Sequence, residues 1–239
     1  MNNGRPHLLG LLAGLFLAAG LICSAALVTR AWLKIAESQT INSTGSARKN
    51  VRSDLIIWRG FFSSEAPTLL EAQHRLKDDL PKIEDFLRSN SVSNHLLTAI
   101  NIQEMRSNDN AQRRVGFRLS QGLEIQSGDV DKITRLSRDS TTLVEQGVQF
   151  TSEPPEYIYT KSGEAKIEML AEATKDARAR AEQIALQGDR KIHQLRSARM
   201  GVFQIASLYS THTSSEGVSD TSSLEKTMTA VVTATFSLK

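Results

Sequence analysis

The segment SGEAKIEMLAEATKDARARAEQIALQ, residues 162–187, decides the helical half of the fold. Apolar and small side chains recur along it at steps of three and four, which predicts a long amphipathic helix. Gly188 is its expected end, and small side chains would let the helix approach its neighbour closely. The predicted inward stripe is rich in alanine and consists of Ile167, Leu170, Ala171, Thr174, Ala177, Ala181, Ile184 and Ala185.

The β-strand half of the fold is decided by the segment TMTAVVTATFSL, residues 227–238. Apolar residues at the even positions from Met228 to Leu238 alternate with a row that is mostly threonine. Alternation with a period of two predicts a β-strand with one buried face. The threonine face is expected either to meet solvent or to pair with another strand.

Weaker patterns fill the rest of the chain. Pro81 lies inside an expected helix and should kink or split it, and Pro154-Pro155 should interrupt a strand. A hairpin-like turn is expected at 107–110, and the Ser/Thr/Gly-rich loop 210–223 is long enough to be mobile or functional. The expected strands are 39–47, 51–62, 95–105, 112–127, 148–160 and 194–209, and the expected helices are 64–89 and 129–146.

The order of these elements predicts the fold class. Without its first strand, the chain up to residue 160 follows a βαββαβ order, in which helices cover one face of an antiparallel sheet. A further unit of one helix and two strands follows. We therefore expect an α+β protein with antiparallel sheets and helices packed on one face.

An apolar run without charge, residues 8–28, precedes the folded part. As a helix it would rise about 31 Å, close to the roughly 30 Å hydrocarbon core of a bilayer. It exceeds the apolar core of a usual signal peptide, which favours a retained transmembrane anchor. Cleavage near Ser24-Ala25-Ala26 stays open as an alternative. The expected organisation is an anchor or signal at 1–30, a tether at 31–38 and one domain at 39–239.

Composition excludes several classes of function. The only cysteine, Cys23, lies in the apolar run, so the domain has no disulfide, thiol nucleophile or thiolate metal site. Arg5 and Arg30 precede residue 31, which leaves 27 basic and 26 acidic side chains after it. This near balance argues against nucleic-acid binding. The five histidines are scattered without HxH or HExxH spacing, so no metal or other cofactor is expected.

No sequence motif indicates a particular reaction, so no catalytic residue is assigned. The Gly-rich phosphate loops and the GxSxG motif are missing from the sequence. Arg113, Arg114 and Arg118 would form a basic strand face, which could bind an anionic envelope component or simply pair with nearby acids. Tyr157 and Tyr159 would project to one side of a strand, where they could anchor a subunit interface or pack in the core.

Several stretches together resemble the SIMPL-domain family of bacterial extracytoplasmic proteins. They run from Ser43-Thr44-Gly45-Ser46-Ala47 with Asp54, through Val115-Gly116-Phe117, to the alanine-rich helix at 171–182 with Gly188. Residues 154–159 and 200–205 resemble a membrane-anchored subgroup. The resemblance covers residues 38–239. It implies export, a tendency to self-associate and a loose association with envelope or oxidative stress, and it brings no catalytic residues.

The leading hypothesis is therefore a non-enzymatic protein, anchored by one helix in the bacterial inner membrane with its domain in the periplasm. It would act by self-assembly, as a homo-oligomer, or by binding a protein partner, and the sheet edges and the loop 210–223 would make the contacts. Two rivals stay open: a module that binds a small envelope metabolite, and a hydrolase whose site is dispersed along the sequence. A soluble periplasmic form is expected if the first helix is cleaved.

Overall fold

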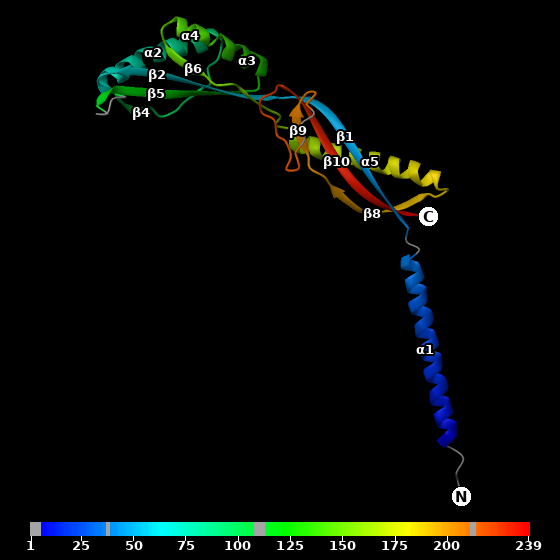
Figure 1. Cartoon of the computed structure of the whole chain (residues 1–239). Helices are drawn as coiled ribbons and strands as arrows, with labels where there is room; N and C mark the ends of the chain where they lie inside the picture. The colour runs from blue at the N-terminus through cyan, green and yellow to red at the C-terminus, as the bar shows by residue number, and fades with distance from the viewer. Residues whose placement is uncertain (1–5, 37–38, 108–112, 211–213) are drawn as a thin grey trace. The chain divides into compact units, whose positions relative to one another are not determined.

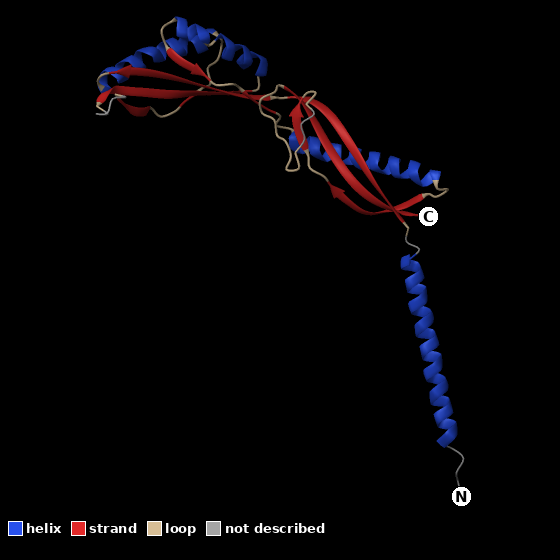
Figure 2. Cartoon of the chain, in the orientation of Figure 1, coloured by secondary structure: helices blue, strands red, loops and turns tan. Residues whose placement is uncertain are grey.

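The computed structural model describes residues 6–36, 39–107, 113–210 and 214–239, and Figure 1 names its elements. The chain divides into two compact units. Unit 1 contains the described residues up to Ser46, together with Glu172–Gly201 and Val231–Lys239. Unit 2 contains Ala47–Ala171 and Val202–Ala230. Helices and antiparallel strands occur in both units (Figure 2), so the expected α+β class is confirmed.

Helix α1, Pro6–Ala36, contains the apolar run. Its segment Gly10–Leu33 is long and apolar enough to cross a membrane, and its side chains are exposed. The helix extends through residues 31–36 of the expected tether, whereas residues 37 and 38 lie outside the described part. Because so apolar a surface is costly to expose to water, α1 is suited to a bilayer or to a signal segment.

Apart from α1, unit 1 is built from three strands and helix α5. The strands lie in the order β1–β10–β8, and β1 and β10 run antiparallel with hydrogen-bonded side chains across the pair. Thr44 contacts Thr233 at 3.1 Å, and Thr235 donates to Asn42 at 2.7 Å. The threonine row of β10 therefore lines a polar sheet face. The elements are β1 (Thr40–Arg52), β8 (Ile192–Met200), β10 (Glu225–Leu238) and α5 (Ser162–Gln187), of which β1, α5 and β10 continue into unit 2.

Helix α5 has the predicted bounds, but part of the predicted stripe was wrong. Ile167 and Ile184 are 73% and 56% exposed. The residues that α5 buries instead recur at every fourth position: Ala165, Met169, Ala173, Ala177, Ala181 and Ala185.

Gly45 on β1 explains this choice of small residues. A Cβ atom at Gly45 would lie 2.2 Å from the carbonyl oxygen of Ala173 and 2.2 Å from the amide nitrogen of Ala177. The two backbones are therefore in contact, and no large side chain fits between them. The Ser46 amide donates to the Asp176 carboxylate at 2.8 Å and fixes the strand along the helix.

Unit 2 follows the expected βαββαβ order, but the expected strands 95–105 and 148–160 and the expected helix 129–146 are each divided in two. Its main sheet runs β3–β5–β2–β6, with β4 also paired to β5 and β7 to β2, and all these pairs are antiparallel. Helices α2, α3 and α4 lie along one face of this sheet (Figure 1). The bounds are β2 Leu55–Ala66, α2 Leu69–Ser89, β3 Leu96–Leu97, β4 Asn101–Arg106, β5 Arg114–Ser127, α3 Val130–Asp139, α4 Thr141–Glu145, β6 Gln149–Ser152, β7 Glu156–Ile158 and β9 Gln204–Ser207.

The core of unit 2 is built from large side chains. Strand β2 is central and buries Ile56, Trp58 and Phe62 against the helices. The indole Nε1 of Trp58 donates to Ser152 Oγ at 2.9 Å, which satisfies the one polar atom of that side chain. Helix α2 contributes Leu76, Ile83 and other apolar residues.

Some element boundaries differ from those predicted. Helix α2 begins at Leu69, with Thr68 Oγ1 accepting from the Glu71 amide at 3.3 Å, and it continues without a split past Pro81. The expected strand 194–209 is two strands, β8 and β9, which pair with different parts of β10. The expected turn at 107–110 lies mostly outside the described residues, as do positions 211–213 of the loop 210–223.

Candidate functional site: an open strand edge and a small pocket

Strand β8 forms an edge of the unit 1 sheet. It pairs with β10 and, among the described residues, with no other strand. Every residue from His193 to Met200 is exposed, including Leu195 at 50% and Met200 at 56%. A strand edge of this kind presents a row of backbone N–H and C=O groups to any chain that can pair with it.

The apolar side chains of β8 lie on the face that α5 covers elsewhere. Leu195 is the register partner of Phe236, and Met200 is the partner of Val232. Directly opposed residues project to the same face of a sheet, and Phe236 packs with Ala177 and Ala181 of α5. The helix therefore shields β10, while the same face of β8 stays open.

The β8 segment is basic. No Asp or Glu occurs between Asp189 and Glu216 in the sequence. Arg196 and Arg199 are exposed, and neither forms an ion pair with any residue that the structure describes. The edge thus combines open backbone groups, exposed apolar side chains and unpaired positive charge.

The predicted basic face of β5 is an ion-paired surface in its larger part. Arg118 bonds Glu65 of β2 at 2.5 Å through Nη2. Arg114 lies 3.9 Å from Glu104 of β4 and stacks over the Phe117 ring, 5.2 Å from its centroid. Arg113 precedes the strand and is exposed, and its carbonyl accepts from the Ser107 amide at 2.8 Å.

The two predicted tyrosines are not equivalent. Tyr157 packs against the core of unit 2, and its hydroxyl lies 3.1 Å from Thr134 Oγ1 of α3. Tyr159 follows β7 and is half-buried. Tyr157 therefore has a structural role in joining β7 to α3.

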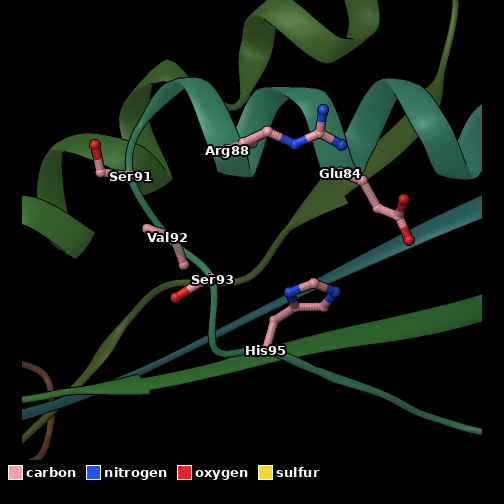
Figure 3. A pocket seen from close by; sticks show the side chains of 6 residues that line it. All are labelled: Glu84, Arg88, Ser91, Val92, Ser93 and His95. Carbon is pink, nitrogen blue, oxygen red and sulfur yellow. The ribbon is translucent and has the colours of Figure 1, made fainter.

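A pocket of about 400 Å³ lies at the carboxyl end of α2. Figure 3 shows the six side chains that line it: Glu84, Arg88, Ser91, Val92, Ser93 and His95. Its volume lies toward the lower end of the range that small-molecule sites occupy.

The end of α2 fixes the loop that carries His95. The Val92 amide donates to the Leu87 carbonyl, and the Ser91 amide donates to the Arg88 carbonyl, both at 2.9 Å. These bonds form a Schellman motif, which needs a left-handed residue, and Ser91 supplies it with φ 57°. Lys132 of α3 also donates to the Ser91 carbonyl at 2.7 Å. The loop is thus held at both its backbone and the buried Val92 side chain.

Two titratable side chains meet at this pocket without partners. His95 is half-buried, and its Nδ1 atom is buried without a hydrogen bond. Glu84 is half-buried and forms no hydrogen bond or ion pair with any residue in the described ranges. Figure 3 shows both side chains projecting into the pocket from opposite sides. A buried polar group without a partner costs stability, so such groups mark candidate ligand positions.

A charged cluster connects strands β2, β5 and β7. Arg59 of β2 donates to Glu124 at 2.7 Å and to Glu156 at 2.6 Å. Hydrogen bonds from Arg59 and Gln126 lower the pKa of Glu124. Those from Arg59 to the two glutamates raise its own pKa. This cluster joins β5 and β7 to β2, and all its charges are satisfied, so we assign it to structure.

Lys226 and Asp220 form a buried charged pair. The Lys226 side chain is 1% exposed, and its Nζ donates to the Asp220 carbonyl at 2.5 Å and lies 3.5 Å from the carboxylate. Burial raises the pKa of Asp220, but hydrogen bonds from Ser222 and Ser223 and the charge of Lys226 outweigh it and lower the pKa to about 2. Burial lowers the pKa of Lys226. The pair fastens the described part of the loop before β10.

No group of three or more His, Cys, Asp or Glu side chains suited to a metal ion occurs within the described ranges. The pocket could not be predicted from the sequence, because Glu84 and His95 are 11 positions apart and belong to no motif. The β8 edge had a visible signal, namely the long stretch without acidic residues.

Comparisons with known proteins identify a family and a distant structural similarity. The SIMPL family model, described as a protein of unknown function (DUF541), matches residues 41–236. No curated protein matches the chain. Among solved structures the chain is similar to an amidase of the hydantoinase/carbamoylase family from Burkholderia phymatum, at 11% identity and a TM-score of 0.27. That match covers 52% of this chain and 33% of the amidase chain, and it carries no argument about activity.

Proposed function

We propose that this chain, which belongs to the SIMPL family (DUF541), is a membrane-anchored envelope protein that acts by binding other polypeptides rather than by catalysis. Helix α1 would hold it in the inner membrane, with both units on the periplasmic side. The apolar segment Gly10–Leu33 supports the anchor. The open edge of β8 is the observation that most directly supports the binding function.

Strand addition is the binding mode that fits this edge. A partner in extended conformation would bond to the free backbone groups of β8, and its alternate side chains would contact Leu195 and Met200. The positive charges of Arg196 and Arg199 favour a partner segment that carries Asp or Glu. A second copy pairing through its own β8 would oppose arginine to arginine, which disfavours that form of self-assembly.

In-cell photocrosslinking tests this proposal. A photoreactive residue replaces Leu195 in the full chain, and the control carries it at Leu70, which is 64% exposed on α2. We expect adducts at position 195 whose crosslinked peptide is extended and acidic, and no matching adduct at position 70. An adduct of twice the chain mass would instead identify a second copy as the partner. Absence of adducts at position 195 would refute the proposed interface.

A charge-reversal pair provides the matched control. Arg196→Glu with Arg199→Glu should abolish the adduct at position 195. Arg135→Glu with Arg138→Glu makes the same change of net charge on exposed residues of α3 and should leave it intact. Equal loss in both variants would show that net charge, not the β8 edge, governs binding.

Glu84 and His95 favour a second candidate function, the binding of a small ligand. A ligand ammonium group could donate to both unpartnered side chains, while its carboxylate met Arg88, so a free amino acid is the probe of choice. Arg88 is available because its ion pair with Asp85 is largely exposed and therefore weak. A ligand of the native state raises the unfolding temperature.

A thermal-shift screen of amino acids against the full chain tests the pocket. We expect one class to raise the unfolding temperature, and Glu84→Gln to abolish that increase. Glu71→Gln, on the exposed first turn of the same helix, is the control and should keep it. If no amino acid stabilises the chain, the pocket has no role of this kind. Labelling by a serine-hydrolase probe would count against the non-enzymatic assignment.

A further inference from the structure

The end of unit 1 at which β1 begins lies close to the end of α1. Helix α1 ends at Ala36, and β1 begins at Thr40. Consecutive Cα atoms are about 3.8 Å apart, so these two residues are separated by at most about 15 Å. The apolar segment of α1 ends at Leu33, and three further helical residues add only about 4.5 Å.

Backbone hydrogen bonds bring the ends of two other strands to the same place. The Leu238 amide donates to the Gln39 carbonyl at 2.9 Å. Lys191 and Lys239 exchange two bonds, of 3.1 and 2.8 Å. Neighbouring strands are about 4.8 Å apart, so Lys191 and Lys239 lie within about 10 Å of Gln39. If α1 spans a bilayer, chain length alone keeps this end near the lipid headgroups.

Unpaired positive charge gathers at this end. Arg190, Lys191 and Lys239 are exposed, and none of them forms an ion pair with a described residue. Asp189 is the one acidic residue between positions 183 and 215. In unit 2, by contrast, Arg59 is held by two glutamates. The free cations of unit 1 are therefore available to an external anion.

Exposed apolar side chains lie next to these cations. Ile184 and Leu186, in the last turn of α5, are 56% and 53% exposed. The Arg190 amide donates to the Ala185 carbonyl at 2.9 Å, which places Arg190 directly at the end of this turn. Basic and apolar side chains side by side are typical of surfaces that rest on a membrane interface.

We propose that this end of unit 1, consisting of Ile184, Leu186, Arg190, Lys191 and Lys239, docks on anionic lipid headgroups. The three cations contact lipid phosphates, and Ile184 and Leu186 enter the boundary between headgroups and acyl chains. The short connection to α1 favours the bilayer as the binding partner, because the bilayer lies next to this surface whenever α1 is inserted. The proposal rests on the part of the proposed function that places α1 in the membrane.

Fluorescence of the full chain in lipid nanodiscs tests this docking. Leu186→Cys, in a Cys23→Ser background, carries an environment-sensitive fluorophore, and Leu70→Cys in unit 2 is the labelled control. The nanodiscs contain phosphatidylcholine alone or phosphatidylcholine with 30% phosphatidylglycerol, a composition that we choose to supply a strong negative surface.

We expect a blue shift at position 186 in the anionic nanodiscs, with at least a twofold loss of quenching by aqueous iodide. Both effects should reverse in high salt, which screens the headgroup charge. Arg190→Glu with Lys191→Glu should abolish them, and position 70 should show neither. An aqueous spectrum at position 186 in both lipids would overturn the proposal, as would failure of the chain to enter nanodiscs.

The two proposals can fail separately. Loss of lipid docking in Arg190→Glu with Lys191→Glu should leave the photocrosslink at Leu195 unchanged. Loss of the crosslink in Arg196→Glu with Arg199→Glu should leave the fluorescence at position 186 unchanged. A result in which each pair of substitutions abolished both signals would contradict the assignment of two distinct surfaces.

Discussion

Units 1 and 2 both pack helix on antiparallel sheet, but they fill their cores in opposite ways. Unit 1 uses small residues, with Ala177, Ala181 and Ala234 around a single phenylalanine, Phe236. Unit 2 uses large ones, including Trp58, Phe62 and many leucines and isoleucines. A small-residue core depends on the close approach of backbones, whereas a large-residue core depends on volume.

The difference has a consequence for function. Helix α5 lies so close to β1 that it covers β1 and β10, and it leaves the same face of β8 exposed. In unit 2, three helices pack along the sheet, and its central strand β2 is paired on both sides. Unit 1, the unit with the smaller core, therefore leaves one face of its edge strand β8 uncovered.

Removing volume from unit 2 should have the largest effect. Trp58→Ala should lower the free energy of unfolding by about 3–5 kcal/mol, because it leaves a cavity and removes the bond to Ser152. Hydrogen exchange of β2 and α2 measures the loss. Phe61→Ala, at a 39% exposed neighbour, is the control and should cost far less. Equal losses of stability in the two variants would mean that buried side-chain volume does not stabilise unit 2.

Adding volume to unit 1 should have the second largest effect on stability. Gly45→Ala would place a Cβ atom 2.2 Å from backbone atoms of α5. The helix must then move away, and we expect unit 1 to lose about 3 kcal/mol. Gly163→Ala, where nothing lies within 4 Å, is the control and should be neutral or slightly stabilising. If hydrogen exchange of residues 172–187 is the same in Gly45→Ala as in the unmodified chain, the close approach of β1 and α5 does not stabilise unit 1.

The buried pair in unit 2 should make its stability depend on pH. The folded pKa of Asp220 is about 2, below its ordinary 3.8. The carboxylate therefore stabilises the fold above about pH 4, and this contribution is lost as the pH falls toward 2. Asp220→Asn should cost about 2 kcal/mol at pH 7 and almost nothing at pH 2. Denaturant unfolding of both proteins at the two pH values measures this difference. An equal loss of stability at pH 7 and pH 2 would argue against a stabilising pair of Asp220 and Lys226.

A backbone substitution at the pocket should have the smallest effect. Ser91 has φ 57°, a conformation that glycine adopts without strain. Ser91→Gly should therefore stabilise unit 2 by up to about 1 kcal/mol. Gly147→Ala, at φ 82°, should destabilise it by a similar amount. Thermal unfolding measures both, and changes of the same sign would contradict the backbone argument.

The sequence predicted the fold well where a pattern was long and regular. The bounds of α5 and the alternation of β10 agree with the structure. Local hydrogen bonds accompany one of the differences. The expected helix 129–146 is interrupted at Ser140, where Ser137, Ser140, Thr141 and Thr142 each bond the carbonyl three residues earlier. Side chains that compete for helix carbonyls leave no periodic signal.

The candidate surfaces were less predictable. Periodicity identifies which residues of α5 are small, but it does not show that Gly45 would meet them and draw the helix toward β1. The exposure of β8 follows from that distant contact. Glu84 and His95 come together because Ser91 reverses the chain. The Ser/Asn-rich stretch 89–94 indicates a turn, but it does not show which side chains the turn brings together. The open face of β8 therefore depends on a tertiary contact, whereas the pocket depends on a local turn at the end of α2.

Hydrogen–deuterium exchange of the purified full chain tests the central claim most directly, because it compares an open strand edge with a closed strand in one sample. The backbone amides of β8 that do not face β10 should exchange within seconds. Those of β2, which is paired on both sides, should stay protected at least a thousand times longer. Protection of every β8 amide to the level of β2, in the chain without a partner, would contradict the account.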